Sequence, residues 1–149
     1  MYDRYEINST TMAIIPLDNM SSKVIEAHHE FVVKKSVLDI MDDSCRFFGS
    51  SYEGRHEGTK YLIGINYKSP IIVEESLELI FFPTSSPRMQ DCMWLSLAYI
   101  EKYYKAGVKT IVHFKNGKSI DLNISYGSLE NQVLRATRLE SVLHKRKLA

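Results

Sequence analysis

Residues 110–124 read TIVHFKNGKSIDLNI, and this stretch carries the strongest local fold signal in the chain. Apolar and polar side chains alternate on both sides of Asn116-Gly117, as in two strands joined by a tight turn. Asn-Gly predicts a type I′ turn, because both central residues of that turn need a positive φ. We therefore expect an antiparallel hairpin of residues 110–114 and 119–124.

A helix is expected after this hairpin. Ser128 is a typical N-cap residue, and the apolar residues after it recur every three or four positions. The stripe consists of Leu129, Val133, Ala136, Leu139 and Leu143. From residue 135 on, five Lys and Arg residues stand against Glu140 alone. This imbalance suits a solvated helix with a cationic last turn, and it also suits a surface for an anionic partner.

A second helix is expected in the first third of the chain. Ser36 is a good N-cap, and Asp39 stands three residues later, as in a capping box. The residues that would share the apolar face of this helix are Val37, Ile40, Met41, Cys45 and Phe48. Gly49 follows at a position where helices commonly end in a left-handed conformation.

The rest of the chain predicts short strands and loops. Strands are expected at residues 5–8, 12–17, 23–27, 31–33, 61–67, 71–73 and 77–82. Residues 50–58 predict a loop or a single helical turn, and residues 85–91 predict an exposed loop. Residues 93–103 suit a helix by spacing and a strand by composition. The pattern is that of one α+β domain, residues 1–149, with mainly antiparallel strands, one internal helix and one C-terminal helix.

Composition narrows the class of protein. The chain has 149 residues, 44% hydrophobic and 25% charged, a balance that excludes a disordered or collagen-like chain. Its longest stretch without a charged residue, 7–17, is short of the roughly 20 apolar residues of a membrane span. No apolar core of a signal peptide follows Met1. The two cysteines, Cys45 and Cys92, are too few for a disulfide framework, so we expect a cytoplasmic protein.

Charge is uneven along the chain, although the net charge is only +1. Residues 1–43 carry four basic and eight acidic residues, a net of −4, whereas residues 44–149 carry 15 basic and 10 acidic residues, a net of +5. A net charge so near zero does not indicate a general polyanion binder. A local basic face is expected in the second stretch.

Motifs of enzymes and metal sites are missing from the sequence. The five histidines include no pair with the i, i+4 spacing of a helical zinc site, and there is no Cys-x-x-Cys. Cys45 falls on the core-facing side of its predicted helix, where a thiol usually packs rather than reacts. No nucleophile elbow, P-loop or dinucleotide fingerprint is present. We therefore expect no metal, no cofactor and no catalytic residue.

Residues 44–55 read SCRFFGSSYEGR. This stretch combines arginine, hydroxyl and backbone amide groups with aromatic rings, which are groups that hold phosphates and enter a minor groove. The same residues also suit a helix end and a turn, with Phe47, Phe48 and Tyr52 in the core. Composition alone favours this second interpretation.

The same stretch resembles the longest motif of the bacterial competence transcription factor family, ComK. Further segments resemble landmarks of that family in the same order along the chain. They are residues 68–73, with Ser69 where the family has proline, residues 81–84 followed by Trp94, residues 114–118 and residues 124–133. The resemblance extends from about residue 5 to the end of the chain.

This resemblance implies a DNA-binding transcription activator of competence genes, which serve DNA uptake. Family members are understood to bind paired A·T-rich boxes through the minor groove, to bend the DNA, and to act as dimers that assemble into tetramers. A narrow A·T-rich minor groove is electronegative and attracts inserted Arg and Lys.

The resemblance has further implications for partners and location. It implies a regulatory adaptor protein as a partner and a place in the cytoplasm, at the nucleoid. It implies no membrane contact, enzyme activity, metal or cofactor. Family members often continue beyond the position of Ala149, so we expect a C-terminal extension of the family to be absent here.

Arg46 and Arg55 are the first candidates for DNA contact, because they lie in the matching motif and a hydrophobic core does not account for their charge. The arginine guanidinium is weakly hydrated, which suits minor-groove insertion. Arg46 also suits the end of a helix, where the dipole favours a cation. The further candidates are Lys60, Lys68, Lys115, Lys118, Arg135 and Arg138.

Two other functions stay open at this point. One is a protein-interaction module of the same fold that does not activate transcription, and the other, ranked last, is an enzyme dependent on Cys45. Salt separates DNA binding from an apolar protein interface, because affinity for DNA falls with a log–log slope of about −0.9 per phosphate contact.

Overall fold

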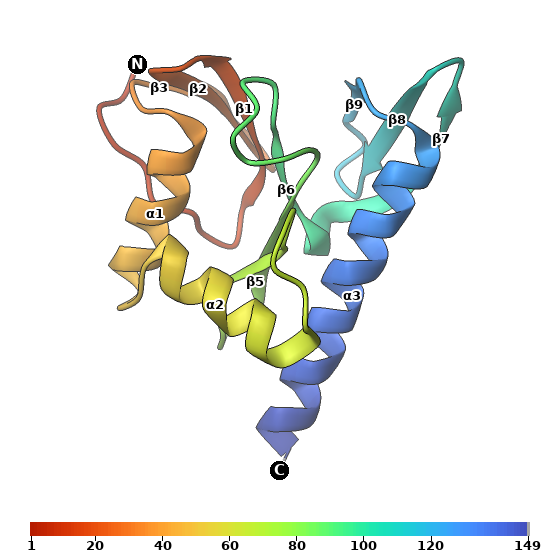
Figure 1. Cartoon of the computed structure of the whole chain (residues 1–149). Helices are drawn as coiled ribbons and strands as arrows, with labels where there is room; N and C mark the ends of the chain where they lie inside the picture. The colour runs from red at the N-terminus through yellow and green to blue at the C-terminus, as the bar shows by residue number, and fades with distance from the viewer. Residues whose placement is uncertain (149) are drawn as a thin grey trace.

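Nine strands, three α-helices and one 3₁₀ turn make up the part of the chain that the structure, a computed structural model, describes: residues 1–148 (Figure 1). In chain order they are β1 (Thr11–Asp18), β2 (Ser21–Glu26), β3 (Glu30–Val33), α1 (Val37–Phe47), α2 (Tyr52–Ile63), β4 (Ile71–Glu74), β5 (Leu79–Pro83), β6 (Trp94–Ser96), η1 (Leu97–Tyr99), β7 (Ile100–Ala106), β8 (Lys109–Phe114), β9 (Ser119–Leu122) and α3 (Tyr126–Leu148). The predicted α+β class is confirmed.

Two antiparallel sheets organise these elements. The larger sheet has the strand order β3-β2-β1-β6-β5-β4, and the smaller sheet has the order β7-β8-β9. At the centre of the larger sheet, Leu95 of β6 pairs with Ala13 of β1 on one side and with Phe82 of β5 on the other. The expected predominance of antiparallel strands is confirmed.

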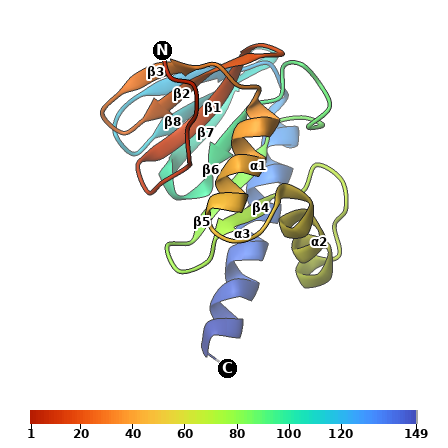
Figure 2. The same cartoon turned by 90° about the vertical axis from the view of Figure 1, so that its left-hand side faces the viewer.

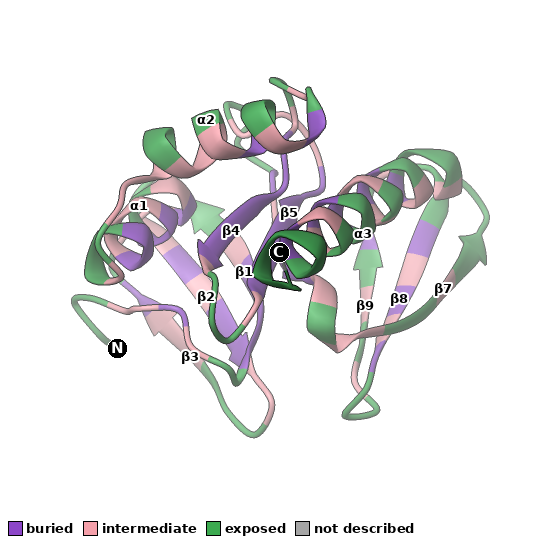
Figure 3. Ribbon diagram, turned by 90° about the horizontal axis from the view of Figure 1, so that it is seen from below, coloured by how far each residue is buried: buried purple, intermediate pink, exposed green. Residues whose placement is uncertain are grey.

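The larger sheet is covered on both faces. Side chains alternate across a strand, so Phe81 packs with the buried residues of α1 while Phe82 packs with those of α3 and the smaller sheet. Figures 1 and 2 show α1 and α3 on opposite faces of this sheet. Figure 3 shows the buried strands β4 and β5 between α1 and α3. The arrangement leaves the outer face of α3 and the outer face of the smaller sheet open to a partner.

The helix α1 confirms the prediction made from its N-cap. The Ser36 hydroxyl accepts a hydrogen bond from the Asp39 N–H (3.1 Å). Most of the predicted apolar face is buried, namely Val37, Ile40, Met41 and Cys45, and Phe48 packs against the same cluster. Gly49 follows with φ of 89°, as the left-handed end of a helix requires.

The prediction of a loop or a single helical turn at residues 50–58 is wrong, because α2, a helix of 12 residues, begins at Tyr52 and continues beyond this segment. The Ser51 hydroxyl accepts a hydrogen bond from the Gly54 N–H (2.9 Å) and so caps this helix. Thr59 and Ile63 are buried one turn apart. The burial of this face outweighs the low helix propensity of the two glycines inside the helix.

The strand predicted at residues 61–67 is also wrong. Tyr61 and Ile63 belong to the last turn of α2, and Gly64 ends the helix with φ of 74°. Tyr61 is 80% exposed and Tyr67 is 62% exposed. The alternating apolar residues are therefore not one face of a strand, and two of them are surface aromatics.

Other expected strands are present with shifted ends. Those predicted at residues 12–17, 23–27, 31–33, 71–73 and 77–82 correspond to β1, β2, β3, β4 and β5. Residues 5–8 form no strand, because the Ile7 N–H donates to the buried Ser44 hydroxyl (2.9 Å) instead of to a neighbouring strand. Residues 85–91 form the expected loop. The ambiguous residues 93–103 contain β6, the turn η1 and the start of β7.

The predicted hairpin is confirmed, but its turn type is wrong. Of the two turn residues, Gly117 has a positive φ (90°), whereas Asn116 does not. The Gly117 N–H donates to the Phe114 carbonyl, and the Phe114 N–H donates to the Lys118 carbonyl. This pattern fits a three-residue loop with one left-handed glycine rather than a type I′ turn.

The C-terminal helix begins earlier than predicted. It starts at Tyr126, and the Ser128 N–H donates to the Ser125 hydroxyl (3.2 Å), so Ser125 and not Ser128 takes the capping role. Four of the five predicted stripe residues are buried, namely Leu129, Ala136, Leu139 and Leu143. Val133 packs against them while partly buried.

Candidate nucleic-acid interface

The motif of residues 44–55 forms the corner between α1 and α2. Arg46 lies in the last turn of α1, and its Nε donates to Asp42 Oδ2 (2.8 Å). The other oxygen of Asp42 accepts a hydrogen bond from the Tyr52 N–H at the start of α2 (2.9 Å). The hydrogen bond from Arg46, and after it the one from Tyr52, holds the pKa of the Asp42 carboxyl below its usual range. Arg46 therefore helps to fix this corner, although 65% of its side chain is exposed.

Arg55 has a different environment from Arg46. Its side chain is 20% exposed, and its Nη1 lies 3.2 Å from Glu75 Oε1 in the turn between β4 and β5. Its Nε is buried and has no hydrogen-bond partner among residues 1–148. The first two predicted DNA contacts are thus both paired with carboxylates, and Arg55 is largely enclosed.

The aromatic residues of this motif divide between core and surface. Phe48 and Tyr52 pack against the core cluster that includes Cys45. Phe47 is 63% exposed, so the interpretation that placed it in the core is wrong for this residue. Phe47 lies on the outer side of α1, where it contacts the Phe48 ring edge to face at 5.0 Å between centroids.

The structure brings Lys68 and Arg135 together, although 67 positions separate them. The Arg135 guanidinium lies 5.1 Å from the centre of the Tyr67 ring, and its Nη1 donates to the Tyr67 carbonyl (3.3 Å). The buried Gln132 donates from Nε2 to the Lys68 carbonyl (2.9 Å). These contacts attach the loop after α2 to α3. Lys68 and Arg135 also line one shallow polar pocket, together with Thr84, Ser128 and Asn131.

A second arginine of α3 is stacked on a tyrosine in the same way. Arg146 lies 5.9 Å from the centre of the Tyr61 ring, and Tyr61 belongs to α2. Arg135, Arg138 and Arg146 are spaced by three and then eight residues, so they share one side of the helix. We use the name α2–α3 face for the cations and tyrosines that α2, the loop after it and this side of α3 contribute; they are Lys60, Tyr61, Tyr67, Lys68, Arg135, Arg138 and Arg146.

The α2–α3 face differs from the motif of residues 44–55, in which Arg46 and Arg55 are both paired with carboxylates. Among residues 1–148, its five cations form no ion pair with a carboxylate. Glu57 precedes Lys60 by one turn in α2 but makes no ion pair with it. Four predicted candidates, Lys60, Lys68, Arg135 and Arg138, thus belong to α2, the loop after it and α3. Tyr61, Tyr67 and Arg146 were not among the predicted contacts, because the sequence pattern favoured a strand for both tyrosines and a cationic last helical turn for Arg146.

Lys115 and Lys118 lie apart from that face, at the turn between β8 and β9. Lys118 Nζ is 2.6 Å from Glu30 Oε2, and Glu30 also pairs with Lys23 (2.9 Å). Lys118, and after it Lys23, lowers the pKa of the Glu30 carboxyl. Asn116 Nδ2 donates to the Ala27 carbonyl (2.9 Å), so this turn is attached to the loop between β2 and β3.

Three further lysines, none of them predicted, lie on the smaller sheet. Lys102 and Lys105 belong to β7 and Lys109 begins β8, and all three are exposed. Lys105 and Lys109 lie on either side of the two-residue turn Gly107-Val108, and Lys102 lies farther back on β7. Glycine at the first position of a two-residue loop is a hairpin signal, so this turn could have been found in the sequence.

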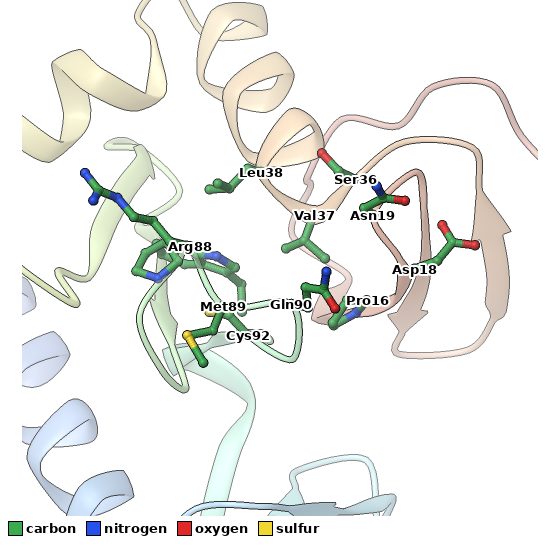
Figure 4. A pocket seen from close by; sticks show the side chains of 12 residues that line it. Pro16, Asp18, Asn19, Ser36, Val37, Leu38, Arg88, Met89, Gln90 and Cys92 are labelled. Atoms are coloured by element: carbon green, nitrogen blue, oxygen red, sulfur yellow. The ribbon is translucent and has the colours of Figure 1, made fainter.

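The pocket in Figure 4 offers no chemistry comparable to these surfaces. It lies beside the start of α1 and the loop before β6, and its volume is about 160 Å³. Its wall is largely apolar, including Pro16, Val37, Leu38, Met89 and Cys92. Asp18 and Arg88 lie at opposite ends of the group of side chains, so they do not form an acid–base pair (Figure 4).

Neither cysteine has the features of a nucleophile. Cys45 and Cys92 are both buried, and burial raises the pKa of the Cys45 thiol to about 11. Within residues 1–148, no group of three or more His, Cys, Asp or Glu side chains is arranged to hold a metal ion. In the same part of the chain, no helix is long and apolar enough to cross a membrane.

The comparisons with known proteins agree on one protein family. The model of the ComK protein family matches residues 2–148. The chain is 40% identical, over 148 residues, to the competence transcription factor of Bacillus subtilis (strain 168), an alignment that covers 97% of this chain and 77% of that protein. No solved structure matches the chain. Because the family match covers nearly the whole chain and agrees with the motifs found in its sequence, the chain belongs to the ComK family.

Proposed function

We propose that this protein regulates transcription of competence genes by binding A·T-rich duplex DNA through its minor groove. The observation that carries this proposal is the 40% identity to a competence transcription factor over 97% of the chain. The proposal extends to a dimer that assembles into tetramers on paired boxes, to a regulatory adaptor protein as a partner, and to a place at the nucleoid.

The α2–α3 face is the surface that we propose for contact with the DNA backbone. Phosphates are held chiefly by Arg and Lys, and the cations of this face have no competing carboxylate partner within residues 1–148. Arg135 and Arg146 lie over tyrosine rings, and a guanidinium stacked in this way keeps its charge and the N–H donors of its planar edge. Such side chains suit a phosphate or an electronegative A·T minor groove.

Arg46, Arg55 and Lys118 remain proposed contacts of lower rank. Each is paired with a carboxylate, Asp42, Glu75 and Glu30 respectively. A phosphate would have to compete with that carboxylate for the cation. Lys115, by contrast, is exposed at its turn and forms no ion pair in residues 1–148.

A gel-shift titration tests the proposal. One duplex carries two A·T-rich boxes on the same helical face, and a G·C-rich duplex of equal length serves as the control. Both are titrated at several salt concentrations, with and without a minor-groove-binding drug. We expect selective binding to the A·T duplex that the drug abolishes, because the drug and the protein compete for one groove.

A double variant, Arg135→Ala with Arg138→Ala, tests the proposed surface. We expect weaker binding and a log–log salt slope reduced in magnitude by about 1.8, the contribution of two phosphate contacts. The matched control is Arg4→Ala with Lys34→Ala, which removes two exposed cations near the N-terminus. Equal and weak binding of the unmodified protein to both duplexes would contradict the proposal and favour a protein-interaction module of this fold.

A further inference from the structure

The hairpin of β7 and β8 ends in an exposed tip. Every residue from Tyr104 to Lys109 is exposed, and Val108 at the turn is 90% exposed. Ala106 pairs with Lys109, so the loop has two residues, Gly107 and Val108. Gly107 has φ of 67°, whereas Val108 does not have a positive φ, as in a type II′ turn. This turn type preserves the twist of the two strands up to the tip, which appears at the upper right of Figure 1.

The base of this hairpin is firmly attached to the rest of the fold. The Tyr103 hydroxyl donates a hydrogen bond to Glu130 of α3. The buried Thr110 donates from Oγ1 to the Ile124 carbonyl (2.8 Å), and Val112 belongs to the core cluster. The hairpin is therefore a ribbon with a fixed base and an open tip.

The charge of the tip favours an anionic partner. Lys102, Lys105 and Lys109 form no ion pair within residues 1–148. Two carboxylates share this sheet, Glu101 at the base of β7 and Asp121 of β9, which pairs with Ile111. Because β7 is an edge strand, its lysines disfavour pairing with a strand of a second copy, which would bring like charges together.

The apolar side chain at the tip favours one kind of anionic partner, a DNA minor groove. Val108 is the apolar residue of the turn, and it is almost fully exposed. Proteins that bend DNA from the minor groove insert an apolar side chain between base pairs and surround it with cations. Val108, with Lys105 and Lys109 beside it, has this combination.

We propose that the β7–β8 hairpin enters the minor groove of DNA and that Val108 inserts at a base step, bending the duplex. This inference rests on the proposed function, because it requires that the protein bind DNA. It assigns the bend to a surface separate from the α2–α3 face. Each surface can therefore be altered without the other.

The test measures binding and bending separately. Energy transfer between dyes at the two ends of a duplex with A·T boxes reports the bend, and a gel shift reports affinity. We expect Val108→Ser to lose most of the bending signal. The matched control is Met20→Ser, which removes a 74% exposed apolar side chain from the loop between β1 and β2, at another hairpin.

The lysines of the tip are tested by Lys105→Ala with Lys109→Ala. We expect this double variant to reduce the salt slope by about 1.8 in magnitude, because two phosphate contacts are removed. All substituted side chains are exposed, so thermal unfolding should be unchanged. Unchanged bending and salt dependence in both tip variants, with an unmodified protein that binds DNA, would overturn this inference and leave the proposed function standing.

A labelled protein gives an independent readout. Cys45 and Cys92 are buried, so Val108→Cys supplies one accessible thiol for an environment-sensitive dye. We expect its emission to shift on addition of the A·T duplex, whereas a dye at Met20→Cys should not respond. An equal response at both positions would contradict insertion of the tip. Failure of the unmodified protein to bind DNA at all would overturn the proposed function together with this inference.

Discussion

Arg135 contacts both the ring and the backbone of Tyr67. The guanidinium lies 5.1 Å from the ring centre, and Nη1 donates to the Tyr67 carbonyl (3.3 Å). The same guanidinium lowers the pKa of the Tyr67 hydroxyl, because a nearby hydrogen-bonding cation favours the phenolate. This pair defines the position of the loop after α2 relative to α3, and with it one end of the α2–α3 face.

The ring of Tyr67 should matter for DNA binding, and its hydroxyl should not. Tyr67→Ala removes the surface over which Arg135 is ordered, and we expect affinity for the A·T duplex to fall by about two- to fivefold. Tyr67→Phe keeps the ring and should bind like the unmodified protein. A gel-shift titration of the two variants measures the difference, and equal losses in both would contradict the role of stacking.

A substitution at Lys68 should affect stability through the backbone and DNA binding through the lost charge. It has φ of 47°, a left-handed conformation that disfavours residues other than glycine. We expect Lys68→Gly to raise the free energy of unfolding by about 0.5–1 kcal/mol while it weakens DNA binding. Urea unfolding and a gel shift provide the two measurements.

The control for Lys68→Gly is the same substitution in a helix. Lys60 lies in α2, where glycine is less favourable than other residues, so Lys60→Gly should lower stability by about 1 kcal/mol. Lys60→Gly also removes a cation from the α2–α3 face. A loss of stability in both variants would show that the backbone of Lys68 is not strained.

Ser44 has a structural role inside the longest family motif. Its buried hydroxyl accepts from the Ile7 N–H (2.9 Å) and donates to the Ile40 carbonyl (2.7 Å). Ser44→Ala leaves a buried N–H without its partner, and we expect a loss of about 1–3 kcal/mol in urea unfolding. Ser141→Ala, at an exposed position of α3, is the matched control. An equally small effect of both substitutions would exclude this hydrogen bond as a support of the N-terminal segment.

Local sequence signals predicted the elements that carry their own caps and periodicity. The Ser36 cap with its apolar face predicted α1, and the Asn116-Gly117 turn predicted the hairpin, although not its turn type. The helix α2 also has its own cap, Ser51, but Gly54 and Gly58 inside it and its few apolar residues hide a helical period, so tertiary contacts are needed to support it. One of them is the hydrogen bond from Thr59 Oγ1 to the Pro70 carbonyl (2.6 Å). Such contacts override the propensity of a glycine-rich, polar segment.

The candidate site was predicted only in part for a similar reason. Arg and Lys residues are visible in a sequence, but their pairing with carboxylates is not. The pairing of Arg55 with Glu75 joins residues 20 positions apart, and the stacking of Arg146 on Tyr61 joins residues from two helices. The α2–α3 face therefore emerges only when the packing of α3 against α2 is known.

Asp42 makes the corner between α1 and α2 sensitive to pH. Its carboxyl accepts from Arg46 Nε (2.8 Å) and from the Tyr52 N–H (2.9 Å), and these hydrogen bonds lower its pKa in the folded state. A carboxyl whose pKa is lower in the folded than in the unfolded state adds stability above the unfolded pKa. That stability is lost as pH falls through the folded pKa.

Asp42→Ala should therefore destabilise the protein in a way that depends on pH. We expect a loss of about 1 kcal/mol at pH 7, because the side chain is about one third exposed and solvent screens its ion pair. The difference from the unmodified protein should shrink as pH falls below about 4, where the carboxyl takes up a proton. Urea unfolding at several pH values measures it, with the exposed Asp91→Ala as the control. A difference that stays constant down to pH 3 would contradict a charged role for Asp42 and leave only its contact with the Tyr52 N–H.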